Sequence, residues 1–213
     1  IDPAAEKPGD QADWHADDGY AALRDLADQL RSFLALSPRQ LPALNGADPA
    51  SPAGIGAGAG LSGARWIDVE NYHVTLRFAG DINARLADDF AHGLDAVRPR
   101  RIELVIDALD VFGGAKPRAL VALVKPTPQL VALHAEHESV ARRAGLVPET
   151  RKFTPHVTLA RLRGTQAAAA AFHIASLGRF PVQRFLASRF VLFSSRASVG
   201  GGPYVVEAAY PLG

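Results

Sequence analysis

NYHVTLRF (Asn71–Phe78) and FTPHVTLARL (Phe153–Leu162) share the tetrapeptide His-Val-Thr-Leu, about eighty residues apart in the chain. Successive side chains of a β-strand point to opposite faces, so the His and Thr of each copy lie on one face. Val and Leu take the other face, where they can pack in a core. The repeat therefore predicts two strands, each with an imidazole and a hydroxyl on the same side.

Two such strands around one cleft would carry out acid–base chemistry at a phosphorus atom. An imidazole titrates near neutral pH, so one copy can accept a proton while the other donates one. The two hydroxyls can donate hydrogen bonds to phosphoryl oxygens. For one copy alone, a packing histidine beside a β-forming threonine is the simpler interpretation. Two identical copies in comparable halves of the chain favour a shared catalytic site.

The composition excludes several classes of protein. The 213-residue chain has no cysteine, so disulfide frameworks, zinc–thiolate sites and cysteine nucleophiles are excluded. No apolar run reaches the roughly 18 residues of a membrane helix, and no signal peptide is evident. We expect a bacterial, cytoplasmic, monomeric protein that does not bind membranes. The chain starts at Ile1 and has no methionine, which suggests a fragment whose true beginning is missing.

The net charge of +1 hides an asymmetry. Residues 1–138 hold 13 Lys and Arg against 20 Asp and Glu, a balance of −7. Residues 139–213 hold 10 against 2, a balance of +8. Such an asymmetry indicates either an anionic partner on one side or an arginine-rich solvated surface. A short anionic ligand suits these numbers better than a nucleic-acid duplex does.

Periodicity predicts an α+β protein. Residues 1–19 and the Gly/Ala/Pro-rich tract 45–63 are expected to be flexible segments, and the glycines of the tract lack the strand and helix that a phosphate-binding loop needs. A single domain over residues 1–213 would then comprise two lobes of duplicated layout. We expect helices over 20–36, 83–97, 127–145 and 167–172, and strands around 73–79, 100–113, 118–125, 153–162, 188–196 and 203–212.

Longer stretches around both copies resemble a known family. RWIDVENYHVTLRFAGDI (65–82), PETRKFTPHVTLAR (148–161) and YVVEAAYPL near the C-terminus resemble the 2H phosphoesterase superfamily. Within it they are most similar to the RNA 2′,3′-cyclic phosphodiesterases, also called 2′-5′ RNA ligases. The likeness runs from about Leu61 to the end. It implies a bilobal, pseudo-two-fold fold with antiparallel sheets lining a central cleft and helices outside. The short strand that usually precedes the first helix of the family is not visible here.

The resemblance implies roles for particular residues. His73 and His156 match the catalytic histidines, and three residues match the phosphate-binding positions: Thr75, Thr158 and Arg161. Strict alternation would turn Arg161 away from His156, so the strand is expected to bend or end near Ala160.

Other side chains near the motifs are weaker candidates for the cleft. Arg77 keeps the parity of His73, so it either lines the cleft or is a surface arginine. Tyr72 and Phe153 could line the cleft and stack on a nucleobase.

The implied reaction is hydrolysis of RNA 2′,3′-cyclic phosphate ends to 2′-phosphates, without metal or other cofactor, and with 2′-5′ RNA ligation as an associated activity. We hypothesise that His73 protonates the leaving 3′ oxygen and His156 activates water, although the similarity of the two copies allows the reverse. The alternatives are a different substrate, such as a small cyclic nucleotide or an ADP-ribose derivative, and a non-catalytic protein that binds RNA ends. The HAEHE stretch (134–138) suggests either a metal site or an exposed helix face, and the exposed face is favoured.

Overall fold

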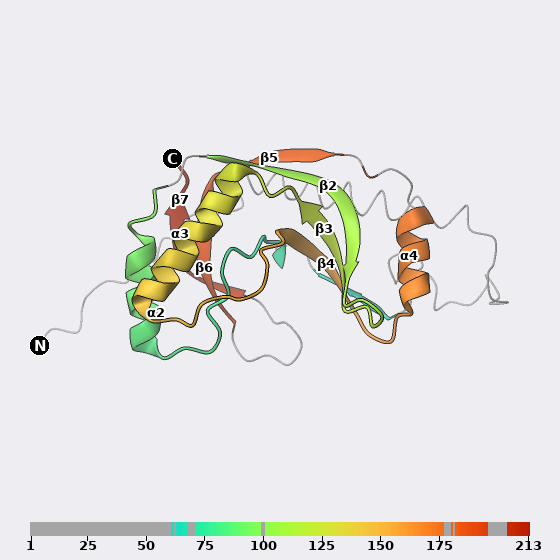
Figure 1. The fold of residues 1–213 in the computed structure, drawn as a ribbon, viewed down its shortest axis with the longest axis horizontal. Helices are drawn as coiled ribbons and strands as arrows, with labels where there is room; N and C mark the ends of the chain where they lie inside the picture. Colours follow the sequence, from blue (N-terminus) through green and yellow to red (C-terminus); the bar gives the residue numbers. More distant parts are fainter. Residues whose placement is uncertain are drawn as a thin grey trace, which may run out of the picture.

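The computed structural model describes residues 61, 63–67, 71–98, 101–176, 180, 182–195 and 204–213. The expected helix over 20–36, the expected flexible segment 1–19 and most of the tract 45–63 lie outside the described residues. The described part is an α+β structure with two antiparallel sheets and helices packed around them (Figure 1). The predicted fold class is confirmed.

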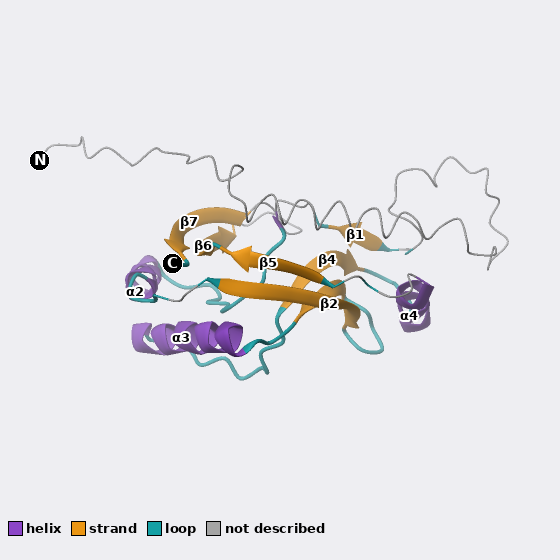
Figure 2. Cartoon of the chain, turned by 90° about the horizontal axis from the view of Figure 1, so that it is seen from above, coloured by secondary structure: helices purple, strands orange, loops and turns teal. Residues whose placement is uncertain are grey.

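Most strands belong to one curved antiparallel sheet, and the last two form a second sheet beside it (Figure 2). The first sheet has five strands in the order β1-β4-β3-β2-β5, and the second pairs β6 with β7. The strand that carries the second HVTL copy is therefore an interior strand. The strands are β1 (Ala64–Trp66), β2 (Ile102–Phe112), β3 (Ala119–Val124), β4 (His156–Leu162), β5 (Gln183–Ala187), β6 (Arg189–Ser195) and β7 (Tyr204–Pro211).

Three helices of the described ranges accompany the sheets, and their ends follow capping chemistry visible in the sequence. Helix α3 (Pro128–Ala144) starts after Thr127, whose Oγ1 accepts a hydrogen bond from the backbone N–H of Leu130 at 3.3 Å. It ends at Gly145, whose φ of 96° is left-handed and favours glycine. Helices α2 and α3 pack against each other, and α4 contacts β2. Their bounds are α2 (Ala84–Leu94) and α4 (Ala167–Ser176).

The core lies on the face of the first sheet that carries Leu120 and Leu159, both with no exposed surface. Phe90 of α2 and Leu133 of α3 belong to the same buried cluster. Burying several large apolar side chains, at roughly 1.5–3 kcal/mol each, holds the sheet and these helices together.

Two strands were not predicted. β1 is only three residues long, which is too short for a periodic signal. β5 precedes the expected strand over 188–196, in a stretch where no element was expected. The chain changes sheets at Ser188: β5 pairs with β2, whereas β6 pairs with β7. Only tertiary pairing separates them.

Candidate active site

The first HVTL copy lies in an extended segment with little regular pairing. The prediction of a regular strand over 73–79 is wrong, because the only assigned pairing within the described part of this segment is an antiparallel bridge between Val74 and Val157. This bridge nevertheless joins the centres of the two copies. On either side of it the antiparallel direction places His73 across from Thr158, and Thr75 across from His156. The two triplets are thus related by an approximate two-fold axis through the bridge.

The second copy lies on β4 and follows the expected alternation up to Thr158. The register with β3 then skips a residue, because Val121 faces Thr158 whereas Leu120 faces Ala160. Leu159 and Ala160 are both fully buried in succession. This β-bulge restores Arg161 to the exposed face of His156 and Thr158. The expected bend near Ala160 is confirmed.

Both imidazoles are oriented in the same way. Nδ1 of His73 is 2.8 Å from the carbonyl oxygen of Asn71, and Nδ1 of His156 is 2.7 Å from the carbonyl oxygen of Thr154. A carbonyl only accepts hydrogen bonds, so Nδ1 carries the proton in each ring. Nε2 is therefore the proton-accepting atom of each neutral imidazole and a proton donor when the ring is charged. Each histidine thus presents the same atom for proton transfer.

The environment of His73 favours its neutral form. Burial lowers the pKa of His73 below the ordinary value of 6.5, and the hydrogen bond to Asn71 opposes this only in part. The positive charges of His156 and Arg161 lower the pKa of His73 further. Because these two charges act on His73, the structure brings together side chains from both copies and from beyond the bulge.

Aromatic rings flank both histidines. Tyr204 contacts His73 edge-on with ring centroids 5.0 Å apart, and Phe193 lies 6.0 Å from the same imidazole. Phe112 contacts His156 edge-on at 4.7 Å. These rings come from β6, β7 and β2, so the two catalytic candidates lie between the two sheets. Sequence reasoning missed all three rings because no local signal connects these distant strands to the motifs.

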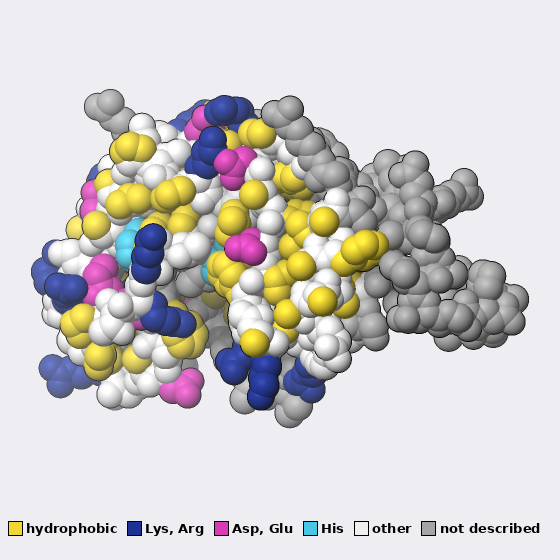
Figure 3. Space-filling view, turned by 45° about the vertical axis from the view of Figure 1, so that its right-hand side comes forward, with side chains coloured by type: hydrophobic (Ala, Val, Ile, Leu, Met, Phe, Trp, Pro, Cys, Tyr) yellow, Lys and Arg dark blue, Asp and Glu magenta, His cyan; other side chains and the backbone are white. Residues whose placement is uncertain are grey.

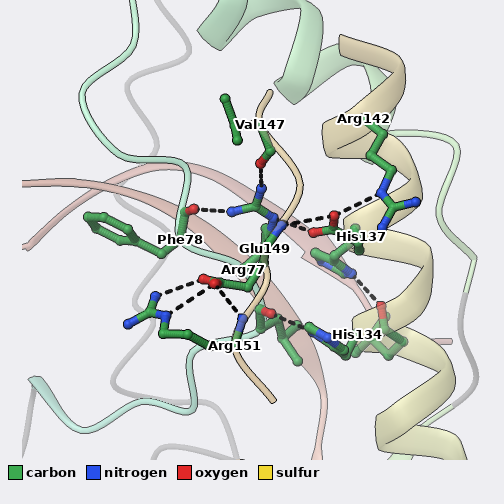
Figure 4. A network of polar contacts seen from close by, with 11 residues as sticks. Arg77, Phe78, His134, His137, Arg142, Val147, Glu149 and Arg151 are labelled. Carbon is green, nitrogen blue, oxygen red and sulfur yellow. Dashed lines mark hydrogen bonds and ion pairs between the residues drawn. The ribbon is translucent and has the colours of Figure 1, made fainter. Parts of the chain in front are cut away.

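Arg77 binds a carboxylate of helix α3. Its Nε lies 2.6 Å from a carboxylate oxygen of Glu138, and its guanidinium also donates to the carbonyl oxygens of Phe78 and Val147 (Figure 4). Its side chain is only 5% exposed. Arg77 is therefore neither a cleft-lining nor a surface arginine, which corrects both interpretations. It attaches the segment after the first motif to α3.

Helix α3 also contacts the segment before the second motif. Nδ1 of His134 lies 2.8 Å from the carbonyl oxygen of Leu76 (Figure 4). The His134 ring stacks on Phe153 with centroids 3.9 Å apart. Phe153 is thus held by α3, and Tyr72, at 9% exposed, belongs to the core. The expectation that both aromatic residues line the cleft does not agree with these contacts.

The HAEHE stretch is not an exposed helix face, which corrects that prediction. His137 is buried at 4% exposure, and the side chain of Glu138 is 13% exposed. Besides Arg77, Glu138 accepts hydrogen bonds from Arg142 at 2.9 Å and from the backbone N–H of Glu149 at 3.2 Å. Among the described residues, no group of three or more His, Asp or Glu side chains could hold a metal ion.

The space-filling view shows a hollow between two halves of the molecule, with a histidine side chain visible at its edge (Figure 3). Within the described ranges, no helix is long and apolar enough to cross a membrane.

Comparison with known proteins places the chain among the two-histidine phosphoesterases, the 2H superfamily. The sequence model of the LigT-like phosphoesterases matches the chain twice, over residues 53–122 and 121–204, with one HVTL copy in each match. The chain belongs to the LigT-like phosphoesterase family.

Similar proteins agree with this assignment. The RNA 2′,3′-cyclic phosphodiesterase of Aeropyrum pernix is 31% identical over 102 residues, covering 47% of this chain and 58% of that protein. The protein of the same name from Aquifex aeolicus is 31% identical over 104 residues, covering 46% and 55%. The matches thus span little more than half of these relatives.

Solved structures show the same fold. E. coli LigT, solved with 3′-AMP, superposes with a TM-score of 0.61 at 20% identity, covering 90% of this chain and 92% of that chain. TT0787 of Thermus thermophilus gives 0.60 at 16% identity, covering 87% and 92%. The antiparallel α+β architecture is therefore that of the family.

Proposed function

We propose that this protein hydrolyses RNA 2′,3′-cyclic phosphate ends to 2′-phosphates, using His73 and His156 as an acid–base pair. The observation that carries the proposal is the matched geometry of the two imidazoles, each with Nδ1 directed to a backbone carbonyl. Nε2 of each ring is then available for proton transfer on opposite sides of a phosphorus. Similar proteins named RNA 2′,3′-cyclic phosphodiesterase support the substrate class.

In this mechanism a water molecule attacks phosphorus while Nε2 of His156 accepts its proton. The bond between phosphorus and the 3′ oxygen breaks, and Nε2–H of His73 protonates that oxygen. Thr75, Thr158 and Arg161 would bind the non-bridging oxygens as charge develops on them. The products are a 2′-phosphomonoester and a 3′-hydroxyl. A 5′-hydroxyl of RNA in place of water would give a 2′-5′ linkage by the same steps.

The acid role requires a protonated His73, whereas burial favours the neutral ring. The negative charge of a bound phosphodiester opposes that effect, because an anion near an imidazolium raises the pKa of the ring. We therefore propose that substrate binding itself protonates His73.

The role of each histidine can be tested with a substrate whose bridging 3′ oxygen is replaced by sulfur, because a thiolate leaves without protonation. His73→Ala should then recover most of its lost activity, whereas His156→Ala should not. Recovery of the His156 variant alone would reverse the two roles.

The proposed function is tested by a product assay. A short RNA ending in a 2′,3′-cyclic phosphate, a nucleoside 2′,3′-cyclic phosphate and ADP-ribose 1″,2″-cyclic phosphate are incubated in parallel. We expect turnover of the RNA to a 2′-phosphate. Turnover of the ADP-ribose derivative alone would establish the other substrate class, and RNA binding without turnover of any of the three would establish a non-catalytic binder.

A further inference from the structure

Five exposed cationic side chains gather at one end of the five-stranded sheet. They come from β1, from the hairpin between β2 and β3, and from the end of β4. We call them the basic rim: Arg65, Lys116, Arg118, Arg161 and Arg163.

Backbone contacts bring these residues together. The N–H of Leu162 donates to the carbonyl oxygen of Arg118 at 2.8 Å, which places the hairpin beside the end of β4. The N–H of Arg163 donates to the carbonyl oxygen of Gly63, in the turn before β1, at 3.0 Å. Arg65 lies directly across from Arg161 in the antiparallel register of β1 and β4, so these two side chains share a face. The basic rim is therefore a single surface.

Four cations of the basic rim have no carboxylate partner within the described part of the chain. Lys116, Arg118, Arg161 and Arg163 form no ion pair with a described carboxylate, and the hairpin sequence GGAKPR contains no acid. Five cations elsewhere do have such partners: Arg77 and Arg142 with Glu138, Lys125 with Asp107, Arg151 with Glu149, and Arg184 with Glu103. Clustered like charges repel one another, and an anionic ligand removes that repulsion.

The basic rim continues from the active site. The bulge at Leu159 places Arg161 on the exposed face of β4 with His156, and Arg161 acts on the pKa of His73. Along the strand, Arg161 lies five positions beyond His156, roughly 15 Å at the usual rise. Arg163 lies two residues beyond Arg161, and Lys116 and Arg118 lie on the hairpin between β2 and β3. If a cyclic phosphate lies between the histidines, the preceding phosphates of the same RNA strand would extend along the surface that carries Lys116 and Arg163.

We propose that the cations of the basic rim beyond Arg161 bind the backbone phosphates upstream of the cyclic end, so that the enzyme prefers single-stranded oligoribonucleotides to nucleoside 2′,3′-cyclic phosphates. This inference rests on the proposed function. In the space-filling view, Lys and Arg side chains gather at the lower end of the face that contains the hollow (Figure 3). Contacts to phosphates carry no base information, so the preference is for length and not for sequence.

The test compares two substrates and two matched charge reversals. The substrates are adenosine 2′,3′-cyclic phosphate and an unstructured oligoribonucleotide of about ten nucleotides with the same end. The rim variant is Lys116→Glu with Arg163→Glu. The control is Arg85→Glu with Arg143→Glu, which makes the same charge change on α2 and α3, at the opposite end of the molecule from the hairpin (Figure 1). Thermal unfolding verifies that both variants fold.

We expect the rim variant to lose about tenfold or more in kcat/KM on the oligonucleotide and less than about twofold on the mononucleotide. Losing two phosphate contacts should also reduce the slope of log kcat/KM against log salt by about 1.4, at roughly 0.7 per contact to a single strand. The control should resemble the wild type on both substrates. An unchanged oligonucleotide rate, or equal losses on both substrates, would overturn the inference.

Direct binding separates this inference from the proposed function. The affinity of a fluorescent oligoribonucleotide ending in a 2′-phosphate is measured by anisotropy, which needs no turnover. If the wild type hydrolyses neither substrate, the proposed function fails. The rim is still supported if its variant binds about tenfold more weakly than the control, and it is refuted if the two bind equally.

Discussion

The ion pair between Arg77 and Glu138 provides a quantitative test of how α3 holds the first motif. The two side chains are 5% and 13% exposed, and they approach to 2.6 Å. Removing one partner of such a pair leaves a charge with little access to water, which typically costs about 3–5 kcal/mol. After Glu138→Gln the guanidinium keeps the carbonyl oxygens of Phe78 and Val147 as acceptors. We therefore expect a smaller loss, about 2–3 kcal/mol of unfolding free energy.

The reciprocal change should cost less. After Arg77→Met, Glu138 keeps Arg142 and the backbone N–H of Glu149 as donors, so we expect a loss of about 1–2 kcal/mol. Urea denaturation of both single variants and the double variant gives a coupling energy, expected at about 1–2 kcal/mol. A coupling energy below about 0.3 kcal/mol would refute the reasoning, because the pair would then add nothing beyond its separate neighbours.

The pH dependence of this loss has a definite sign. Burial tends to raise the pKa of Glu138, but hydrogen bonds from Arg142 and Glu149 and the charge of Arg77 lower it overall, below 4.5. A depressed carboxyl pKa stabilises the fold above the unfolded value, and this stabilisation is lost as the pH falls through the folded value. The difference between wild type and Glu138→Gln should therefore shrink below about pH 4.5. A constant difference down to about pH 3 would contradict this account.

Three further outcomes are expected. His73→Ala and His156→Ala should each lose more than about a hundredfold in turnover, whereas EDTA should leave the wild type unaffected; steady-state assays on the cyclic-phosphate RNA check both. Phe193→Ser should raise the pKa of His73 by admitting water, as measured by NMR titration, and Phe172→Ser on α4 should leave it unchanged. Burial also lowers the pKa of His137 below 6.5. As the pH falls through 6.5 the unfolded chain therefore takes up a proton at His137 before the folded chain does, and the free energy of unfolding decreases. The free energies of unfolding at about pH 7.5 and about pH 5 should accordingly differ less in His137→Leu than in the wild type.

Much of the secondary structure could be predicted because its signals are local. Thr127 and Gly145 mark the ends of α3 through capping and a left-handed backbone, and both are legible in the sequence. The first motif was harder: NYHVTLRF reads as a strand, but its residues pair with β4 only through Val74. Periodicity reports which face a side chain prefers, and it does not report whether a neighbouring strand is present.

The candidate site also has one part that could be predicted from the sequence and one part that could not. The paired His and Thr could be predicted, since alternation along an extended chain depends only on sequence. The neighbours of these residues could not. Arg77 shares the parity of His73, yet a carboxylate on α3 binds its guanidinium. Phe112 reaches His156 from β2, and Tyr204 reaches His73 from β7.

By itself, the sequence determined which side chains of each HVTL copy share a face, because a side chain's face on an extended segment follows from its position. Tertiary structure decided how the two copies meet. The bridge between Val74 and Val157 sets their two-fold relation, and the bulge at Leu159 turns Arg161 toward the histidines. Burial between the two sheets lowers the pKa of His73. These features depend on long-range packing, which no local pattern encodes.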